Sequence, residues 1–269
     1  MAVSVTEVVV EQLWRGRVME LRLNRPGQMN ALNSAVIDAL AAGIQAAKDD
    51  SAVAAVFVTA NGRAFSAGAD LIEARERLAS PAIFREGLSS WLRLFRDMER
   101  CPKPVIAIID GLAIAGGLEL ALSCDVIVAS DRAKFGDGHI AYGLVPGGGG
   151  TRRLPDALGT RAARWLMYTG ATVDAHTALA LGLVQHVVPV GELDGWTADF
   201  AETLSSRSAP ALAFMKAMTA SGQVTDERLE HELDAAVHVV AGPDAQEGLA
   251  AFEQRRAPAF PSVTAHQRS

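Results

Sequence analysis

Apolar residues along the chain follow two patterns, short continuous runs and longer stretches with helical spacing. Continuous runs over residues 52–59, Val105–Ile109 and residues 125–129 predict strands that are covered on both faces. Helical spacing predicts one helix that begins at Asn33 or Ser34 and ends near Asp49, and a second over Pro81–Arg100. This alternation of strand and helix predicts an α/β domain with parallel strand pairing.

The two ends of the chain differ from this central pattern. Residues 3–10 and Val18–Leu23 are rich in valine and leucine and predict two strands joined near Arg15-Gly16. Beyond Thr160 the pattern becomes mostly helical, and no strand is predicted over residues 207–256. We therefore expect a core of residues 1–200 and a helical C-terminal region of residues 201–269.

The composition is that of a folded protein, with 49% hydrophobic and 21% charged residues in a chain of 269, which suits one large domain. The net charge of −6 argues against nucleic acid or an anionic membrane as the main partner. Cys101 and Cys124 do not make a disulfide framework and fit a reducing compartment. The chain begins without a signal-peptide pattern, and no apolar run reaches about 18 residues, so a cytoplasmic protein is expected.

Candidate chemistry gathers between Asp110 and Asp125. Two glycines, Gly116 and Gly117, open an amphipathic helix that carries one acid, Glu119. The first amides of a helix are unpaired and lie at its positive end, so they suit a developing negative charge. Glu119 follows Gly116 by three residues and lies on the same side of the helix. Burial would raise the pKa of Glu119, as suits a general acid or base; a capping or salt-bridge role is the alternative.

Glycines and histidines elsewhere in the chain supply weaker signals. The run Pro-Gly-Gly-Gly-Gly-Thr at residues 146–151 lacks the ending of a phosphate loop and predicts a tight turn into a helix. His231 and His238 have no cluster of ligands around them in the sequence, so no metal is expected. If residues 135–140 are extended, Asp137 and His139 project to one face. This pattern leaves both a structural and a chemical role open for His139.

Several motifs in a fixed order carry a resemblance over nearly the full chain. They comprise Asn-Arg-Pro at residues 24–26 with Asn-Ala-Leu-Asn at 30–33, the small-residue segment 64–70, and residues 103–107, 110–125, 135–136, 143–151 and 247–252, followed by Arg255-Arg256. With these motifs the chain resembles the crotonase (enoyl-CoA hydratase/isomerase) superfamily.

The resemblance implies a fold, a ligand and an assembly. The implied fold is an α/β spiral of ββα repeats whose C-terminal helical region builds a homotrimer, often paired into a hexamer. The implied ligand is an acyl-coenzyme A thioester, so coenzyme A enters as part of the substrate and no separate cofactor is expected. The implied oxyanion hole consists of the backbone amides of Ala69 and Gly116. Ala67, Arg25 and Asp70 are the residues expected to bind CoA, with the Ala67 backbone at the adenine and Arg25 at the phosphates.

The resemblance also implies two catalytic glutamates, and this chain departs from that pattern. Glu119 matches the first glutamate, while His139 stands where the second is expected. Hydration of a 2-enoyl-CoA, with Glu119 as principal acid/base and His139 or Asp137 assisting, is the first hypothesis. Isomerisation, thioester hydrolysis, C–C cleavage or decarboxylation through the same enolate is the second. A non-catalytic acyl-CoA-binding protein is the third.

Overall fold

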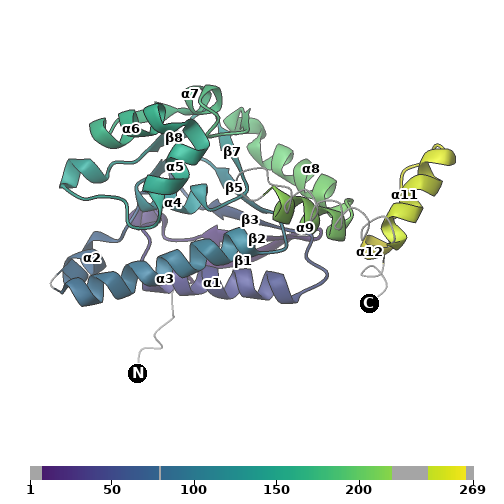
Figure 1. Ribbon diagram of the computed structural model, residues 1–269, viewed down its shortest axis with the longest axis horizontal. Coiled ribbons are helices and arrows are strands. Elements are labelled where there is room, and N and C mark those ends of the chain that lie inside the picture. The colour runs from purple at the N-terminus through teal and green to yellow at the C-terminus, as the bar shows by residue number, and fades with distance from the viewer. Residues whose placement is uncertain (1–7, 79, 220–241, 265–269) are drawn as a thin grey trace, which may run out of the picture.

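The large sheet collects the most apolar strands of the chain. The structure, a computed structural model, describes residues 8–78, 80–219 and 242–264 (Figure 1). Six strands form this sheet in the order β1-β2-β3-β5-β7-β10; β1 pairs with β2 antiparallel, and all the other pairs are parallel. Their bounds are Val10–Arg15, Val18–Leu23, Ala55–Ala60, Val105–Ile109, Val126–Ser130 and His186–Val188.

A small second sheet is built from strands that alternate along the chain with those of the first. Its order is β4-β6-β8-β9, and only β9 runs antiparallel to its neighbour. From β3 to β8 successive strands therefore enter the large and the small sheet in turn, which winds the backbone into a spiral. The strands of the small sheet are Ala64–Ser66, Leu112–Ile114, Lys134–Gly136 and Thr172–Asp174.

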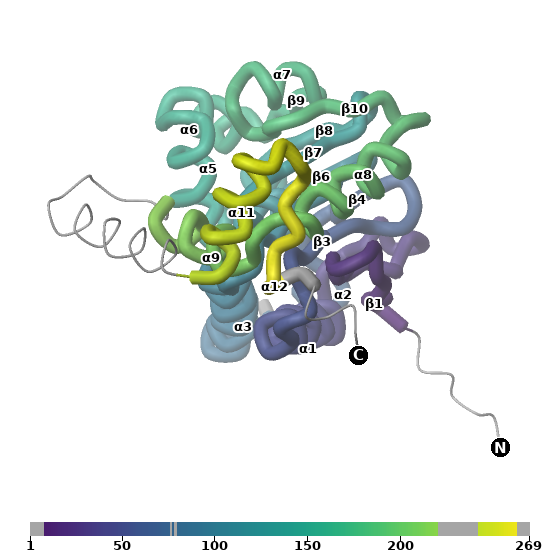
Figure 2. Tube along the Cα trace, turned by 90° about the vertical axis from the view of Figure 1, so that its right-hand side faces the viewer, coloured from purple at the N-terminus to yellow at the C-terminus, as the bar shows by residue number. Residues whose placement is uncertain are grey.

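Helices α1 (Ser34–Asp49) and α3 (Pro81–Arg100) cover one side of the molecule, below the strands in Figures 1 and 2. The Asn33 side chain caps α1 by accepting a hydrogen bond from Val36 N at 3.0 Å. The apolar face of α1 packs on Met19, Leu21 and Leu23 of β2. A Cβ at Gly43 of α1 would lie only 2.5 Å from the Leu21 side chain. A glycine at this helix position thus permits close contact between helix and sheet.

The opposite face of the large sheet is covered by α8 (Leu193–Ser205). Phe57 of β3 stacks on Phe200 of α8, with ring centroids 5.8 Å apart. Because β3 and β5 are buried on both faces, they form continuous apolar runs in the sequence.

The remaining helices form two groups. On the side opposite α1 and α3 lie α6 (Thr160–Thr169) and α7 (Ala175–Ala180), and α5 (Gly150–Leu158) lies between α6 and α3 (Figure 2). The described C-terminal helices are α9 (Ala209–Met218), α11 (Pro243–Glu253) and α12 (Pro261–Thr264), and α11 stands apart from the body of the molecule (Figure 1).

The sequence predictions are confirmed in the centre of the chain and wrong for the first strand. Helices α1 and α3 and strand β5 have the predicted positions, and the glycine turn leads into a helix as expected. The first strand is Val10–Arg15 instead of residues 3–10, of which 3–7 lie outside the described residues. This strand lies at the edge of the sheet and exposes alternate side chains, including Gln12 and Trp14, so it carries no apolar run.

Two further findings concern short elements. Strands β9 and β10 lie in the part predicted as mostly helical, and at three residues each they are too short to produce a periodic pattern. The condition that residues 135–140 are extended is not met beyond Gly136, because Gly138 adopts a φ of 70° and a 3-10 helix, η2, follows over His139–Tyr142.

The C-terminal part is helical in its described residues, while the division of the chain stays a prediction. A boundary at residue 200 would fall within α8. None of the described helices is both long enough and apolar enough to cross a membrane.

Lys216 of α9 ties the C-terminal helices to the core. Its ammonium group lies 2.7 Å from Asp125 Oδ2 and donates to the carbonyl oxygens of Met98 and Lys103 at 2.9 and 3.1 Å. Asp125 immediately precedes β7 and also accepts a hydrogen bond from Val105 N, the first amide of β5.

Replacing Lys216 by Met is expected to lower the free energy of unfolding by about 1–3 kcal/mol, because it leaves a partly buried carboxylate and two carbonyl groups without their donor. Denaturant unfolding measures the change, with the exposed Lys134→Met as control. Equal unfolding midpoints for the two variants would show that Lys216 contributes no more than an exposed lysine.

Candidate active site

Glu119 is a carboxylate buried inside the protein, with 2% of its surface exposed. It lies on α4 (Gly116–Leu122), which follows β6 directly. Its Oε1 atom accepts two backbone hydrogen bonds, from Gly148 N and Gly150 N, each at 2.8 Å. A buried ionised group needs such partners, because desolvation without them costs several kcal/mol.

The four-glycine run is the structure that supplies those partners. A Cβ at Gly148 would lie 2.8 Å from Glu119 Oε2 and from the Phe95 ring, and a Cβ at Gly150 would lie 3.1 Å from Glu119 Oε1. Gly149 has a φ of +99°, a conformation that residues with side chains rarely adopt. The run is therefore a turn whose backbone approaches a carboxylate, a role that the sequence pattern alone did not indicate.

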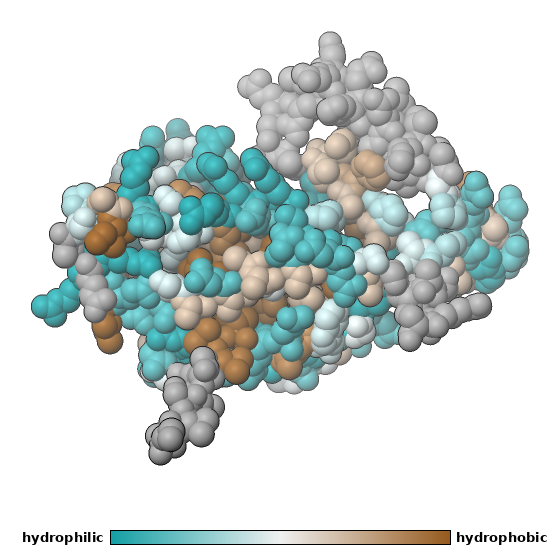
Figure 3. Space-filling view, turned by 90° about the horizontal axis from the view of Figure 1, so that it is seen from below, coloured by the Kyte–Doolittle hydropathy of each residue, from teal (hydrophilic) through white to brown (hydrophobic). Residues whose placement is uncertain are grey.

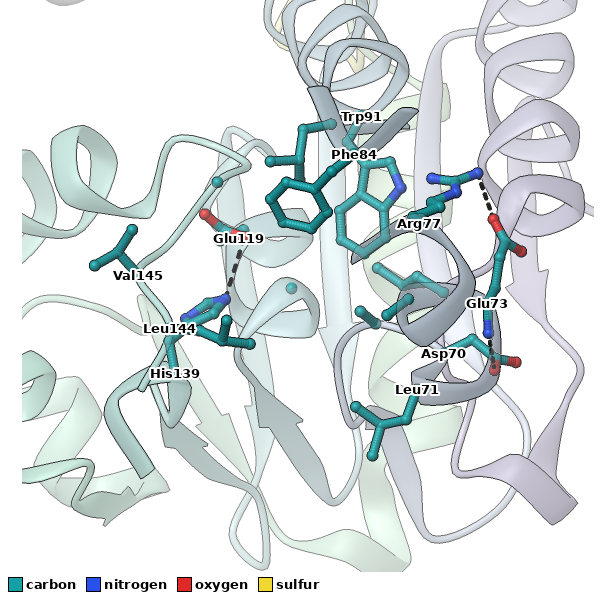
Figure 4. Close-up of a pocket in the computed structure, with 16 residues that line it drawn as sticks. Asp70, Leu71, Glu73, Arg77, Phe84, Trp91, Glu119, His139, Leu144 and Val145 are labelled. Atoms are coloured by element: carbon teal, nitrogen blue, oxygen red, sulfur yellow. Dashed lines mark hydrogen bonds and ion pairs between the residues drawn. The ribbon is translucent and has the colours of Figure 1, made fainter. Parts of the chain in front are cut away.

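His139 faces Glu119 from η2. Its Nε2 atom lies 3.9 Å from Glu119 Oε2, and its Nδ1 atom lies 3.0 Å from Asp137 Oδ1 (Figure 4). A separation of 3.9 Å is longer than a hydrogen bond. A single oxygen atom placed between the two groups can reach both. Asp137, 3% exposed, orients the imidazole so that Nε2 is the atom directed at Glu119.

The surroundings move both pKa values upward. Burial raises the pKa of Glu119, and this effect exceeds the opposing ones of the Gly150 amide, His139 and the Gly148 amide. Burial lowers the pKa of His139, but its hydrogen bond to Asp137 and the charges of Asp137 and Glu119 outweigh that and raise the pKa overall. Both groups are thus suited to exchange protons near neutral pH, where acid–base catalysis is most effective.

The amides of Ala69 and Gly116 are both available for a ligand. In the described part of the chain neither N–H has a hydrogen-bond acceptor. On either side of Ala69 N, Leu32 N bonds to Gly68 O and Asp70 N bonds to Leu32 O, so the Ala69 amide between them is left unbonded. Gly116 N is the first amide of α4, for which the helix supplies no acceptor. A Cβ at Gly68 would lie 3.2 Å from Gly116 N, so the two segments meet closely.

The backbone is strained where β6 turns into α4. Ala115 has a φ of 51° and a ψ of −121°, a combination that costs about 1–3 kcal/mol for a residue with a side chain. The Ala115 N–H donates to Gly136 O at 3.0 Å, and this bond fixes the peptide between Ile114 and Ala115, just before the strained residue. At Gly116 a Cβ would lie 2.5 Å from the Trp91 ring, and at Gly117 a Cβ would lie 2.3 Å from Ser66 O. The glycine pair therefore allows α4 to pack tightly.

One pocket contains these groups (Figure 4). Glu119 and His139 lie on one side of Phe84 and Trp91, and Arg77 and Glu73 lie on the other. Arg77 forms an ion pair with Glu73, and both bond to Ser34 Oγ. The lining residues are Leu32, Ala69, Asp70, Leu71, Glu73, Ala74, Arg77, Phe84, Leu88, Trp91, Gly116, Glu119, His139, Leu144, Val145 and Gly147.

Near this pocket the surface is apolar at the end formed by α2 (Leu71–Leu78). Leu71 and Ile72 of α2 and Ile83 of α3 expose more than half of their surface, and Figure 3 shows apolar surface at the end of the molecule where α2 lies. The mouth of the pocket thus adjoins an apolar surface.

The expected CoA-binding residues are only partly brought together. Arg25 Nη2 lies 2.9 Å from Asp70 Oδ2, and Arg25 Nη1 donates to Ala31 O at 2.6 Å. Asp70 lines the pocket, whereas Arg25 and Ala67 do not. The Ala67 amide donates to Met29 O at 3.0 Å. The charge of Arg25 is thus largely balanced by Asp70.

The described residues contain no cluster of side chains suited to a metal ion. Within residues 8–78, 80–219 and 242–264 no three His, Cys, Asp or Glu side chains are grouped so as to hold a metal ion. His231, His238 and His266 lie outside the described residues.

Three residues at the site were not predicted from the sequence: Gly148, Gly150 and Arg153. Arg153 Nη1 donates to Gly148 O at 2.6 Å and so holds the turn that contacts Glu119. The sequence carried one sign that the glycines have a further role: four in succession are more than a tight turn requires. No sequence signal distinguished Arg153 from the adjacent Arg152.

The comparisons with known proteins find similar proteins over nearly the whole chain. The model of the family described as "Enoyl-CoA hydratase/isomerase" matches residues 15–263. A probable enoyl-CoA hydratase of Mycobacterium bovis is 36% identical over 252 residues, covering 91% of this chain and 94% of its own. A 2,3-dehydroadipyl-CoA hydratase of Escherichia coli is 35% identical, with 95% and 98% covered.

A solved structure gives the same result for the fold. The enoyl-CoA hydratase of Bacillus anthracis superposes with a TM-score of 0.90 at 33% identity, covering 94% of this chain and 99% of its own. The spiral of alternating strands, the match over residues 15–263 and the similarity to these relatives lead to one conclusion: the chain belongs to the enoyl-CoA hydratase/isomerase family, the crotonase superfamily.

Proposed function

We propose that the protein is an enoyl-CoA hydratase that adds water reversibly to a 2-enoyl-CoA. The observation that carries the proposal is the buried Glu119 carboxylate 3.9 Å from the His139 imidazole, in a pocket that also contains the unpaired amides of Ala69 and Gly116. Relatives at 35–37% identity that are named hydratases support the same reaction class.

The pocket suggests where each step takes place. The thioester oxygen is bound by the N–H groups of Ala69 and Gly116, which stabilise the enolate; losing one such donor costs about 3 kcal/mol. A water molecule between Glu119 and His139 forms a bond from its oxygen to C3 and gives a proton to Glu119. The enolate then takes a proton at C2 from His139. Transfer of the proton from Glu119 to His139 restores the starting charges of both groups, so the sum is one water added across the double bond.

The charges of the two groups favour this division of roles over the reverse. Burial raises the pKa of Glu119 and protonated His139 opposes that rise, while ionised Glu119 helps to raise the pKa of His139, so each group stabilises the charged form of the other. The charged pair is ready to accept one proton and donate another. The reverse assignment starts from protonated Glu119 beside neutral His139 and lacks this mutual stabilisation.

The other reactions of the superfamily share the enolate and are separated by turnover. Isomerisation, thioester hydrolysis, C–C cleavage and decarboxylation each give a different product from the appropriate acyl-CoA. A non-catalytic acyl-CoA-binding protein would need no buried acid, and the two amides that contact Glu119 argue against that possibility.

CoA is proposed to lie along the segment that contains Ala67 and Asp70, as the family resemblance implies. Arg25 is the proposed cation for its phosphates. Since Arg25 already contacts Asp70, phosphate binding would compete with this ion pair. No separate cofactor is required by the proposed reaction.

The proposed assembly is a homotrimer or a pair of trimers. Phe252 and Leu249 of α11 are 83% and 63% exposed, and Met215 of α9 is also exposed. Apolar side chains on a helix that stands apart from its own chain are typical of a surface that a second copy covers.

Wild-type protein is expected to remove the conjugated thioester absorbance of crotonyl-CoA or of a longer 2-enoyl-CoA, with a 3-hydroxyacyl-CoA as product. Glu119→Gln is expected to lower kcat at least about a hundredfold, because the amide cannot take a proton from water. Retained absorbance with every chain length contradicts hydration. An unchanged rate in Glu119→Gln removes this residue from the mechanism.

The pH dependence of kcat should have two limbs. The acid limb lies above pH 4.5, the ordinary pKa of a glutamate, because burial raises the pKa of Glu119; activity is lost as the carboxylate takes a proton. The alkaline limb lies above pH 6.5, the ordinary pKa of a histidine, because Asp137 and Glu119 raise the pKa of His139; activity is lost as the imidazolium loses its proton.

Two substitutions assign the alkaline limb. His139→Ala should remove it and lower kcat about a hundredfold or more, and Asp137→Asn should move it to lower pH. His139→Glu serves as the matched variant, since it restores the expected pair of glutamates. His139 is structural if the Ala and Glu variants both match wild type.

Light scattering of the wild-type protein is expected to give three or six times the chain mass of 28.3 kDa. Changing Phe252 and Leu249 together to Asp should shift the mass toward that of one chain, because two charges would be buried at the proposed interface. Val190→Asp, also at an exposed apolar position, is the control. An unchanged mass in the double variant would exclude this face of α11 as the interface.

A further inference from the structure

Arg153 of α5 makes contacts that none of the proposed roles uses. Its Nη1 atom donates to Gly148 O at 2.6 Å, and its Nε atom bonds to Glu99 of α3. Its guanidinium lies over the Phe95 ring, with Cζ 5.7 Å from the ring centroid. Only 15% of the side chain is exposed, so the arginine is fixed by α3 on one side and by the glycine turn on the other.

The contact with Gly148 O falls between the two amides that bind Glu119. The turn contains three successive peptide units: the first provides Gly148 N–H, the second Gly148 C=O and the third Gly150 N–H. The first and third donate to Glu119 Oε1, each at 2.8 Å, and the second accepts from Arg153. Rotation of the middle peptide would turn both neighbouring amides away from the carboxylate.

Besides these contacts, Gly149 O accepts backbone hydrogen bonds from Arg152 N and Arg153 N, each at 3.0 Å, and no other side chain of the described residues bonds to the turn. Glycine has the greatest backbone freedom of any residue, and four in succession would sample many conformations. Gly149 also requires a φ of +99°, and a Cβ there would lie 2.2 Å from Arg153 Nη1. The close approach of arginine and backbone is thus built into this position.

We propose that Arg153 is a positioning residue, which fixes the glycine turn so that the Gly148 and Gly150 amides hold the Glu119 carboxylate in its reactive orientation. Arg153 touches neither the pocket nor Glu119 through a hydrogen bond, and acts through the peptide between Gly148 and Gly149. The role of this residue in turnover rests on the proposed hydratase function. Its role in holding Glu119 does not.

A loosened turn would change the titration of Glu119. Hydrogen bonds from amides favour the ionised carboxylate, so their loss should raise its pKa further. The other charged groups that act on Glu119 are His139 and Asp137, and neither bonds to Arg153. Because removal of the Arg153 charge would also raise the Glu119 pKa, the titration is followed as well in Glu99→Gln, which keeps the guanidinium.

Arg153→Met removes the donor and keeps an apolar chain to cover Phe95. It is expected to lower kcat about tenfold to a hundredfold while KM stays close to wild type, because the fault lies in orientation and not in substrate binding. The acid limb of the pH dependence of kcat should move to higher pH in this variant. Arg153→Lys, which can still donate to Gly148 O, should restore part of kcat and part of the wild-type position of the acid limb. Arg152→Met is the matched control, since Arg152 is exposed and pairs only with Asp156.

A second measurement does not depend on activity. The protein is labelled with ¹³C at the glutamate carboxyl, and NMR follows the Glu119 carboxyl signal across pH. The signal is assigned by comparison with Glu119→Gln. We expect a higher Glu119 pKa in Arg153→Met and no change in Arg152→Met. A wild-type pKa and kcat in folded Arg153→Met overturn the proposal, even if the variant is less stable.

The remaining outcomes separate the two proposals. If the wild-type protein turns over no 2-enoyl-CoA and the Glu119 titration still moves in Arg153→Met, the hydratase function fails and the positioning role stands. If Arg153→Met does not fold, Glu99→Gln, which releases the guanidinium from α3, carries the same NMR test. It should shift the Glu119 pKa in the same direction, and an unshifted titration overturns the proposal.

Discussion

The arrangement of this protein depends on keeping one carboxylate, Glu119, inside an apolar interior. Burial without partners would cost several kcal/mol, so the chain must bring backbone donors to it. The Gly148 and Gly150 amides meet that requirement, and they can approach only because these positions carry no side chain. The same desolvation raises the pKa of Glu119 and suits the group to acid–base chemistry near neutral pH.

The spiral of strands brings the other parts of the site to Glu119 from distant points of the chain. Strand β4 leads to Ala69, β6 leads through the strained Ala115 to Gly116, and β8 leads to His139. Because these three strands are parallel neighbours in the small sheet, their carboxyl ends lie at one edge. Two amides, an acid and an imidazole thereby face one pocket, although they come from well-separated segments of the chain.

The histidine gives this site a different balance of charge from a pair of glutamates. Two carboxylates at this separation would disfavour each other's ionised form, whereas Glu119 and a protonated His139 favour theirs. Asp137 extends the effect by stabilising the imidazolium from its other side. The proposed division, with Glu119 as base and His139 as acid, follows from this mutual stabilisation of the two charges.

Local sequence patterns were sufficient to predict the α/β class, the main helices and inner strands, and the glycine-opened helix with its single acid, because these depend on periodicity and on glycine. Edge strand β1 and the three-residue strands β9 and β10 were missed, since exposed or very short strands leave no apolar pattern. Three features became visible only in the folded chain: the glycine run contacts Glu119, Asp137 orients His139, and Arg153 rather than Arg152 holds the turn. Each of these is a contact whose geometry is set by the packing of the whole chain, which local sequence does not encode.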